Sequence, residues 1–254
     1  MIKFEQAKIR LNHKKKLMNR LILASTSTLH AQDYLAYLLP ELQSFFQGTD
    51  CIVFVPYARP NGMSEEDYTQ KAREAFKTID LNVIGLNEVA DPEATIKKAQ
   101  GIFVGGGNTF LLVRKLHELN LMEPLNQVLD KGIPYLGTSA GANIGGLGMH
   151  TTNDMPIVLP PSLKTLGRVG FNINAHYIEP DKNSTHMGET RETRIREFQC
   201  QNEISVVGLP EGSWLSVMGP EVWAKGAHPV VIFEPNKSVY RMGPDVLLPF
   251  NARE

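Results

Sequence analysis

The sequence from residue 135 to residue 143 reads Tyr-Leu-Gly-Thr-Ser-Ala-Gly-Ala-Asn and places Ser139 between two glycines. The residues that lead into it are apolar and suit a buried strand, and the small residues that follow suit the start of a helix. Gly137 and Gly141 leave room for a tight, strained turn, from which the Ser139 hydroxyl would project at a sheet edge. The pattern therefore predicts a strand, a sharp turn and a helix. It fits a catalytic serine, and it also fits an ordinary glycine-rich turn of an α/β protein.

Short apolar runs alternate with segments of helical spacing on the N-terminal side of this serine. We expect strands at residues 21–24, 51–55, 81–86, 102–104 and 133–136, and helices at 34–42, 68–76, 92–99 and 111–119. Such alternation is typical of an α/β protein with a mostly parallel sheet flanked by helices on both faces. Beyond the serine we expect a turn-rich stretch at 149–166, a charged helix at 188–198 and short strands at 168–173, 205–208, 214–217, 230–233 and 239–242.

The composition is typical of a globular protein of the cytoplasm. The chain has 254 residues, 42% of them hydrophobic, which is enough for a substantial core and favours one domain over two. The formal net charge of -1 gives no reason to expect a nucleic-acid partner. No apolar run approaches the roughly 20 residues that cross a membrane. Cys51 and Cys200 make no disulfide framework and fit a reducing compartment.

The first 19 residues differ from the rest because they are strongly basic. They lack the apolar centre and the small-residue cleavage site of a secretory signal. The segment fits a surface extension, a cationic arm for a partner, or an upstream read-through with Met18 as the true start. We expect residues 1–19 to be a non-catalytic extension and residues 20–254 to form a single α/β domain.

A second glycine-rich loop follows the strand expected at 102–104. Three glycines and Asn108 occupy positions 105–108, so the backbone can approach a ligand closely there. The carboxyl ends of parallel strands meet at one crevice, so this loop and the serine turn would be neighbours. The N–H of Gly107 could then face the same oxyanion as the N–H of Ala140. A phosphate cradle and a tight turn capped by Asn108 are the alternatives, and the first lacks the Gly-Lys-Ser/Thr that a P-loop requires.

A nucleophilic serine needs a base, and the base needs an acid to orient it. Of the seven histidines, His176 is the best placed, because it ends an apolar run and precedes a polar loop. Asp154 and Glu211 are the candidate acids. Asp154 lies in a polar turn between apolar runs, and Glu211 ends an apolar stretch and is followed by glycine. The sequence leaves the choice between them open.

These motifs together resemble the serine peptidase family that contains peptidase E, an α-aspartyl dipeptidase, and cyanophycinase. The similarity runs from about residue 21 to about residue 214 and more loosely beyond. The stretches that carry it are 104–110, 137–143, 151–157, 174–176, 188–191 with 194–197, and 208–212. The resemblance implies a fold like that of class I glutamine amidotransferases, with a nucleophile elbow that holds serine where those enzymes use cysteine. It also implies cleavage of dipeptides that begin with aspartate, with no metal or other cofactor.

The resemblance assigns a role to each candidate at the serine turn. Ser139 would be the nucleophile, His176 the general base and Glu211 the acid that orients the histidine. Asp154 occupies the other acidic position of the family's motif, and we keep it as a supporting or alternative acid.

The resemblance also assigns the residues that would hold the substrate. Gly107 and Ala140 would form the oxyanion hole. Arg191 would pair with the aspartyl carboxylate, since a guanidinium can bind a carboxylate with two hydrogen bonds, and Asn108 would be a further substrate-binding residue. Thr138 departs from the dipeptidases, which typically carry tryptophan before the serine, and is closer to cyanophycinase.

We therefore expect a cytoplasmic serine dipeptidase that hydrolyses α-linked Asp-Xaa through an acyl-enzyme. Cleavage of β-linked aspartyl peptides is the nearest alternative. A catalytically silent binding protein on the same scaffold is an alternative of another class. A glutamine amidotransferase fits less well, because the turn holds Ser139 and Cys51 lies on a different expected strand.

Overall fold

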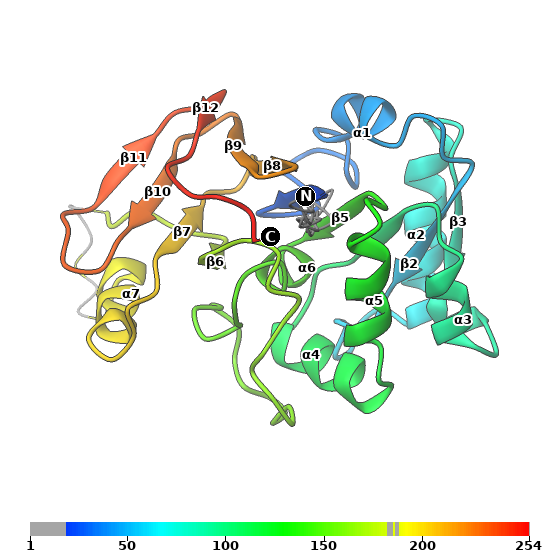
Figure 1. Ribbon diagram of the computed structural model, residues 1–254, viewed down its shortest axis with the longest axis horizontal. Coiled ribbons are helices and arrows are strands. Elements are labelled where there is room, and N and C mark those ends of the chain that lie inside the picture. Colours follow the sequence, from blue (N-terminus) through cyan, green and yellow to red (C-terminus); the bar gives the residue numbers. More distant parts are fainter. Residues whose placement is uncertain (1–18, 182–184, 186–187, 254) are drawn as a thin grey trace, which may run out of the picture.

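A computed structural model describes residues 19–181, 185 and 188–253. Its centre is an eight-stranded sheet with the order β12-β9-β8-β1-β5-β4-β2-β3 (Figure 1). The strands are β1 (Arg20–Ala24), β2 (Cys51–Val55), β3 (Asn82–Gly85), β4 (Ile102–Val104), β5 (Tyr135–Thr138), β8 (Ser213–Met218), β9 (Glu221–Gly226) and β12 (Val246–Leu247). Neighbours from β1 to β3 pair in parallel, and β8, β9 and β12 add antiparallel pairs at the other edge. The expected mostly parallel sheet is confirmed.

Helices cover both faces of this sheet. They are α1 (Leu39–Phe45), α2 (Glu65–Lys77), α3 (Pro92–Lys97), α4 (Thr109–Glu118), α5 (Met122–Leu129) and α6 (Ala140–Asn143), with a 3-10 turn η1 (Leu86–Glu88) after β3. Side chains of β1 alternate between two apolar clusters, with Leu21 and Leu23 in one and Ile22 and Ala24 in the other. The first cluster includes buried residues of α3, α4, α5 and α6, and the second includes those of α1 and α2. The sheet is therefore buried on both faces, as parallel sheets usually are.

A smaller sheet lies beside the large one, on the left of Figure 1, with the order β11-β10-β7-β6. It contains β6 (Asn172–Ala175), β7 (Val206–Leu209), β10 (Val230–Phe233) and β11 (Tyr240–Met242), and α7 (Arg191–Gln199) packs on it through Ile195. Strands β6 and β7 are parallel, so their carboxyl ends lie together. This places the loops after both strands next to the serine turn.

The sequence predictions differ from the structure at five elements. The helix expected at 34–42 begins only at Leu39, because Leu35 has a positive φ of 61° and Pro40 fits the first turn of a helix rather than its interior. Helix α5 and the strands β9 and β12 were not expected. Strand β6 begins four residues later than the strand expected at 168–173, so most of the expected strand lies in the segment that precedes β6. These elements take their stability from packing on neighbours that are distant in sequence.

The basic segment expected to be an extension lies outside the described residues, apart from its last member, Asn19. That side chain is buried, accepts hydrogen bonds from Arg168 at 2.8 and 3.2 Å, and donates one to the carbonyl of Arg253 at 3.0 Å. In the described ranges, no helix is long and apolar enough to cross a membrane.

Candidate active site

Ser139 occupies a strained turn between β5 and α6. Its backbone has φ 53° and ψ -110°, a conformation that costs about 1 to 3 kcal/mol for a residue other than glycine. The Ser139 N–H donates to the carbonyl of Ala24 at 2.9 Å, which ties the turn to the end of β1. A Cβ at position 137 would lie 2.3 Å from the carbonyl oxygen of Gly141, and a Cβ at position 141 would lie 2.2 Å from that of Val104. Both flanking glycines are therefore required by close backbone contacts.

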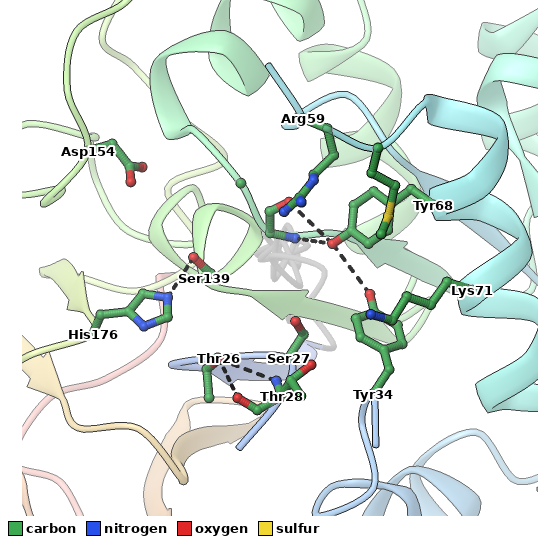
Figure 2. A pocket seen from close by; sticks show the side chains of 13 residues that line it. Thr26, Ser27, Thr28, Tyr34, Arg59, Tyr68, Lys71, Ser139, Asp154 and His176 are labelled. Carbon is green, nitrogen blue, oxygen red and sulfur yellow. Dashed lines mark hydrogen bonds between the residues drawn. The ribbon is translucent and has the colours of Figure 1, made fainter. Parts of the chain in front are cut away.

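His176 faces Ser139 from the loop that follows β6. The distance from His176 Nε2 to Ser139 Oγ is 2.9 Å (Figure 2). His176 also has a positive φ, 56°, and its backbone N–H donates to Ser25 Oγ at 2.9 Å. The buried Ser25 hydroxyl donates in turn to the carbonyl of Leu209 at 2.7 Å. Ser25 thus joins the ends of β1, β6 and β7 and holds the backbone of His176 in place.

Glu211 provides the carboxylate that contacts the imidazole. Its Oε1 lies 2.7 Å from His176 Nδ1, and the Glu211 side chain is 56% exposed. An ionised carboxylate can only accept, so Nδ1 donates to Glu211 and leaves Nε2 free to accept the proton of the Ser139 hydroxyl. The three side chains form one hydrogen-bonded chain from carboxylate to hydroxyl.

Asp154 contacts a different part of the site. Its Oδ2 accepts hydrogen bonds from the backbone N–H of Thr109 at 2.7 Å and from the Thr152 hydroxyl at 2.9 Å. The carboxylate sits at the N-terminus of α4, where the helix dipole favours a negative charge. Asp154 still lines the cavity that contains Ser139 and His176. Of the two candidate acids, the structure brings Glu211 to the imidazole.

The glycine-rich loop lies against the serine turn. A Cβ at Gly106 would lie 2.9 Å from Ser139 Cβ, and a Cβ at Gly107, whose φ is 144°, would lie 2.2 Å from the carbonyl oxygen of Ala58. The backbone N–H groups of Gly107 and Ala140 donate no hydrogen bond to any residue in the described part of the chain. Two free N–H groups beside a serine are what an oxyanion hole requires.

Asn108 caps the helix that follows this loop. Its Oδ1 accepts from the N–H of Leu111 at 3.1 Å, and its Nδ2 donates to the carbonyl of Met155 at 2.8 Å. Both ends of the amide are therefore used within the protein. This is the capping alternative that the sequence left open.

The residues around Ser139 enclose a cavity of about 350 Å³. Sequence reasoning missed most of its side chains, among them Tyr34, Arg59, Tyr68 and Lys71. The Tyr68 hydroxyl accepts from the N–H of Gly106 at 2.8 Å and so supports the glycine-rich loop. Burial raises the pKa values of Tyr34 and Tyr68, so both phenols are neutral. The available signal was that Arg59 follows β2, a strand whose carboxyl end faces the same crevice as the serine turn.

Arg191 begins α7 and lines an adjacent cleft of about 370 Å³ together with Glu179, Glu189 and Arg194. Burial and then the charge of Arg194 lower the pKa of Arg191, and the carboxylate of Asp154 acts in the opposite direction. Arg191 lines this cleft and not the serine cavity itself. It is linked to that cavity by its electrostatic interaction with Asp154. Across the described ranges, no group of three or more His, Cys, Asp or Glu side chains is arranged to hold a metal ion.

The chain is similar to known peptidases in sequence and in fold. The profile of peptidase family S51 matches residues 21–224. A protein named "Peptidase E" from Streptomyces coelicolor is 44% identical over 213 residues, covering 84% of this chain and 86% of its own. A Drosophila melanogaster protein named "Probable alpha-aspartyl dipeptidase" is 40% identical, covering 88% and 93%. A solved peptidase from an acI-B1 Actinobacterium has the same fold with a TM-score of 0.69 at 15% identity, covering 92% and 98%.

Proposed function

The chain belongs to peptidase family S51, and from that premise we propose that it is a serine dipeptidase that hydrolyses dipeptides with an N-terminal α-linked aspartate. The observation that carries the proposal is the chain of contacts at 2.9 and 2.7 Å from Ser139 through His176 to Glu211. The strained strand-to-helix turn at Ser139 supports a nucleophile elbow on a scaffold like that of class I glutamine amidotransferases. The free thiols of Cys51 and Cys200 support a cytoplasmic location.

The reaction proceeds through an acyl-enzyme. Nε2 of His176 takes the proton as Ser139 Oγ attacks the carbonyl carbon of the aspartyl residue, and the carbonyl electrons move onto oxygen. His176 then gives this proton to the amide nitrogen as the bond between carbon and nitrogen breaks and the second residue leaves as an amine. A water molecule then attacks the ester and gives a proton to His176. His176 returns this proton to Ser139 Oγ as the ester bond breaks and aspartate is released.

The backbone stabilises the charge that develops during each attack. The free N–H groups of Gly107 and Ala140 would donate to the oxyanion, and Ala140 begins a helix, which adds the positive end of its dipole. Asp154 holds the glycine-rich loop in position, because its carboxylate accepts a hydrogen bond from the Thr109 N–H directly after that loop. Its part in the reaction is indirect, through the position of the loop.

Arg191 selects the aspartyl side chain. A guanidinium binds a carboxylate with two parallel hydrogen bonds, and the charge of Asp154 already links this arginine to the serine cavity. In this arrangement the aspartyl residue extends from Ser139 toward Asp154 and the cleft that contains Arg191. Asn108 contributes mainly by capping α4, because both ends of its amide have partners in the protein.

A β-aspartyl specificity is the alternative that Thr138 raised. The Thr138 side chain is buried, its hydroxyl has no hydrogen-bond partner in the described part of the chain, and it does not line the serine cavity. It therefore offers no contact that would favour a β-linked substrate. We accordingly place the α-linked dipeptide first.

The test is hydrolysis of Asp-Leu beside Glu-Leu, Ala-Leu and the β-linked isomer of Asp-Leu, all with a chelator present. Cleavage of Asp-Leu in clear preference to the other three supports the proposal. Cleavage of only the β isomer would assign the protein to the β-aspartyl branch. No cleavage, together with no labelling of Ser139 by a serine-directed covalent probe, would indicate a silent binding protein.

A further inference from the structure

Two cations lie on the side of the cavity that the mechanism above does not use. Arg59 belongs to the loop after β2 and Lys71 to α2, and both line the cavity that contains Ser139. The Arg59 guanidinium carbon lies 5.4 Å from the centre of the Tyr68 ring, and Lys71 Nζ lies 5.1 Å from the centre of the Tyr34 ring. Figure 2 shows both side chains on the far side of Ser139 from His176 and Asp154.

Neither cation has a carboxylate partner in the described part of the chain. No ion pair joins Arg59 or Lys71 to any described acidic residue, although surface cations such as Arg73 and Lys97 have one. The Arg59 Nε is buried and has no hydrogen-bond acceptor among the described residues. Cation–π contacts offset only part of the lost hydration of such groups, and a buried donor without an acceptor is destabilising. An anionic ligand in the cavity would supply the missing acceptors.

The position of the cations limits which anion they can take. The scissile carbonyl must lie at Ser139 and at the N–H groups of Gly107 and Ala140. If the aspartyl residue extends toward Asp154 and the cleft of Arg191, the second residue extends the opposite way. In a dipeptide that residue ends in a free α-carboxylate, one residue beyond the scissile bond. An extended residue spans at most about 3.6 Å, so the carboxylate of a dipeptide stays inside the cavity.

We propose that Arg59 and Lys71 bind the free α-carboxylate of the leaving residue and so make the protein select dipeptides over substrates with a blocked C-terminus. The inference rests on the proposed function and names the groups that recognise the other half of its substrate. Arg59 presents a planar fork that can hold a carboxylate by two hydrogen bonds, and Lys71 adds a point charge beside it. A C-terminal amide or a further residue would leave both cations without a counter-charge.

The experiment compares Asp-Leu with Asp-leucinamide, which differ only in the terminal charge. Hydrogen bonds to charged groups are the strong ones, so the wild type should prefer Asp-Leu in kcat/KM by roughly 10- to 100-fold. Arg59→Met and Lys71→Met should each reduce kcat/KM for Asp-Leu by roughly 10-fold or more, mainly through KM. Both variants should keep kcat/KM for Asp-leucinamide within about twofold of wild type, because the change in the protein and the amide in the substrate remove the same interaction. Lys77 lies on the same helix but outside this cavity, so Lys77→Met should leave kcat/KM unchanged for both substrates.

A second measurement keeps the inference testable if a variant folds poorly. Calorimetric titration of the Ser139→Ala protein should show tighter binding of Asp-Leu than of Asp-leucinamide, and Arg59→Gln in that background should remove the difference. Equal kcat/KM for the two substrates in the wild type would overturn the inference alone. Equal losses of kcat/KM on both substrates in Arg59→Met would also overturn it. So would an Arg59→Met protein that no longer prefers Asp-Leu over Ala-Leu, because that result would place the two cations at the aspartyl side chain. Failure to cleave either substrate would overturn the proposed function, and the inference with it.

Discussion

Removal of the Glu211 carboxylate should lower kcat moderately and leave the fold intact. The imidazole gains a full positive charge when it takes the Ser139 proton, and Glu211 Oε1 lies 2.7 Å from its Nδ1. Two unit charges about 4 Å apart attract by about 4 kcal/mol at an effective dielectric constant of about 20 and by about 1 kcal/mol in water. Since the Glu211 side chain is 56% exposed, the lower half of this range applies.

Glu211→Ala should therefore lose about 1 to 2.5 kcal/mol of transition-state stabilisation, or roughly 5- to 70-fold in kcat. Glu211→Gln should lose at least as much, because its amide can donate to Nδ1 and favour the tautomer that cannot accept the serine proton. The assay is steady-state hydrolysis of Asp-Leu, with Asp154→Asn as the matched control and a thermal melt for each variant. An unchanged kcat in Glu211→Ala, or a much larger loss in folded Asp154→Asn, would refute the assignment of Glu211 as the orienting acid.

Three further changes test other parts of the site. Gly107→Ala puts a Cβ 2.2 Å from the Ala58 carbonyl oxygen and should lower kcat by about 100-fold or more by shifting an oxyanion donor; wild-type kcat would exclude Gly107 from that role. Ser25→Ala removes the acceptor of the His176 N–H and should cost about 1 to 3 kcal/mol of unfolding free energy in denaturant titrations, together with a lower kcat; an unchanged unfolding midpoint would contradict the bracing role. Arg191→Met should reduce kcat/KM for Asp-Leu by at least about 10-fold while Ala-Leu changes little, and equal losses on both would rule out recognition of the aspartyl side chain.

The sequence was sufficient to predict that Ser139, His176 and an acid lie together at the centre of the candidate site. Ser139, His176 and Glu211 each follow an apolar run at a strand end, and the alternation of strands and helices predicts that such ends converge. The rule of convergence does not say which of two acids reaches a given atom. Asp154 and Glu211 are equally plausible in sequence, and the choice depends on the parallel pairing of β6 with β7.

Other features depend on contacts that no local pattern encodes. Lys71 looks like a surface charge in sequence, and only the packing of α2 beside β2 and the glycine-rich loop brings it into the cavity next to Arg59. The two hydrogen bonds of the Ser25 hydroxyl span 151 and 184 residues. Strand β9 carries charged residues and is stabilised by its antiparallel pairing with β8, so its own composition gave little indication of a strand.

The most direct measurement is the rate of Asp-Leu hydrolysis by the Ser139→Ala protein beside the wild type, with both proteins shown to melt at similar temperatures. Loss of the nucleophile should reduce kcat by about 10,000-fold or more, as expected when a group that forms the covalent intermediate is removed. A folded Ser139→Ala protein that keeps activity within about tenfold of wild type would contradict the account, because the hydrolysis could not then proceed through an ester on Ser139.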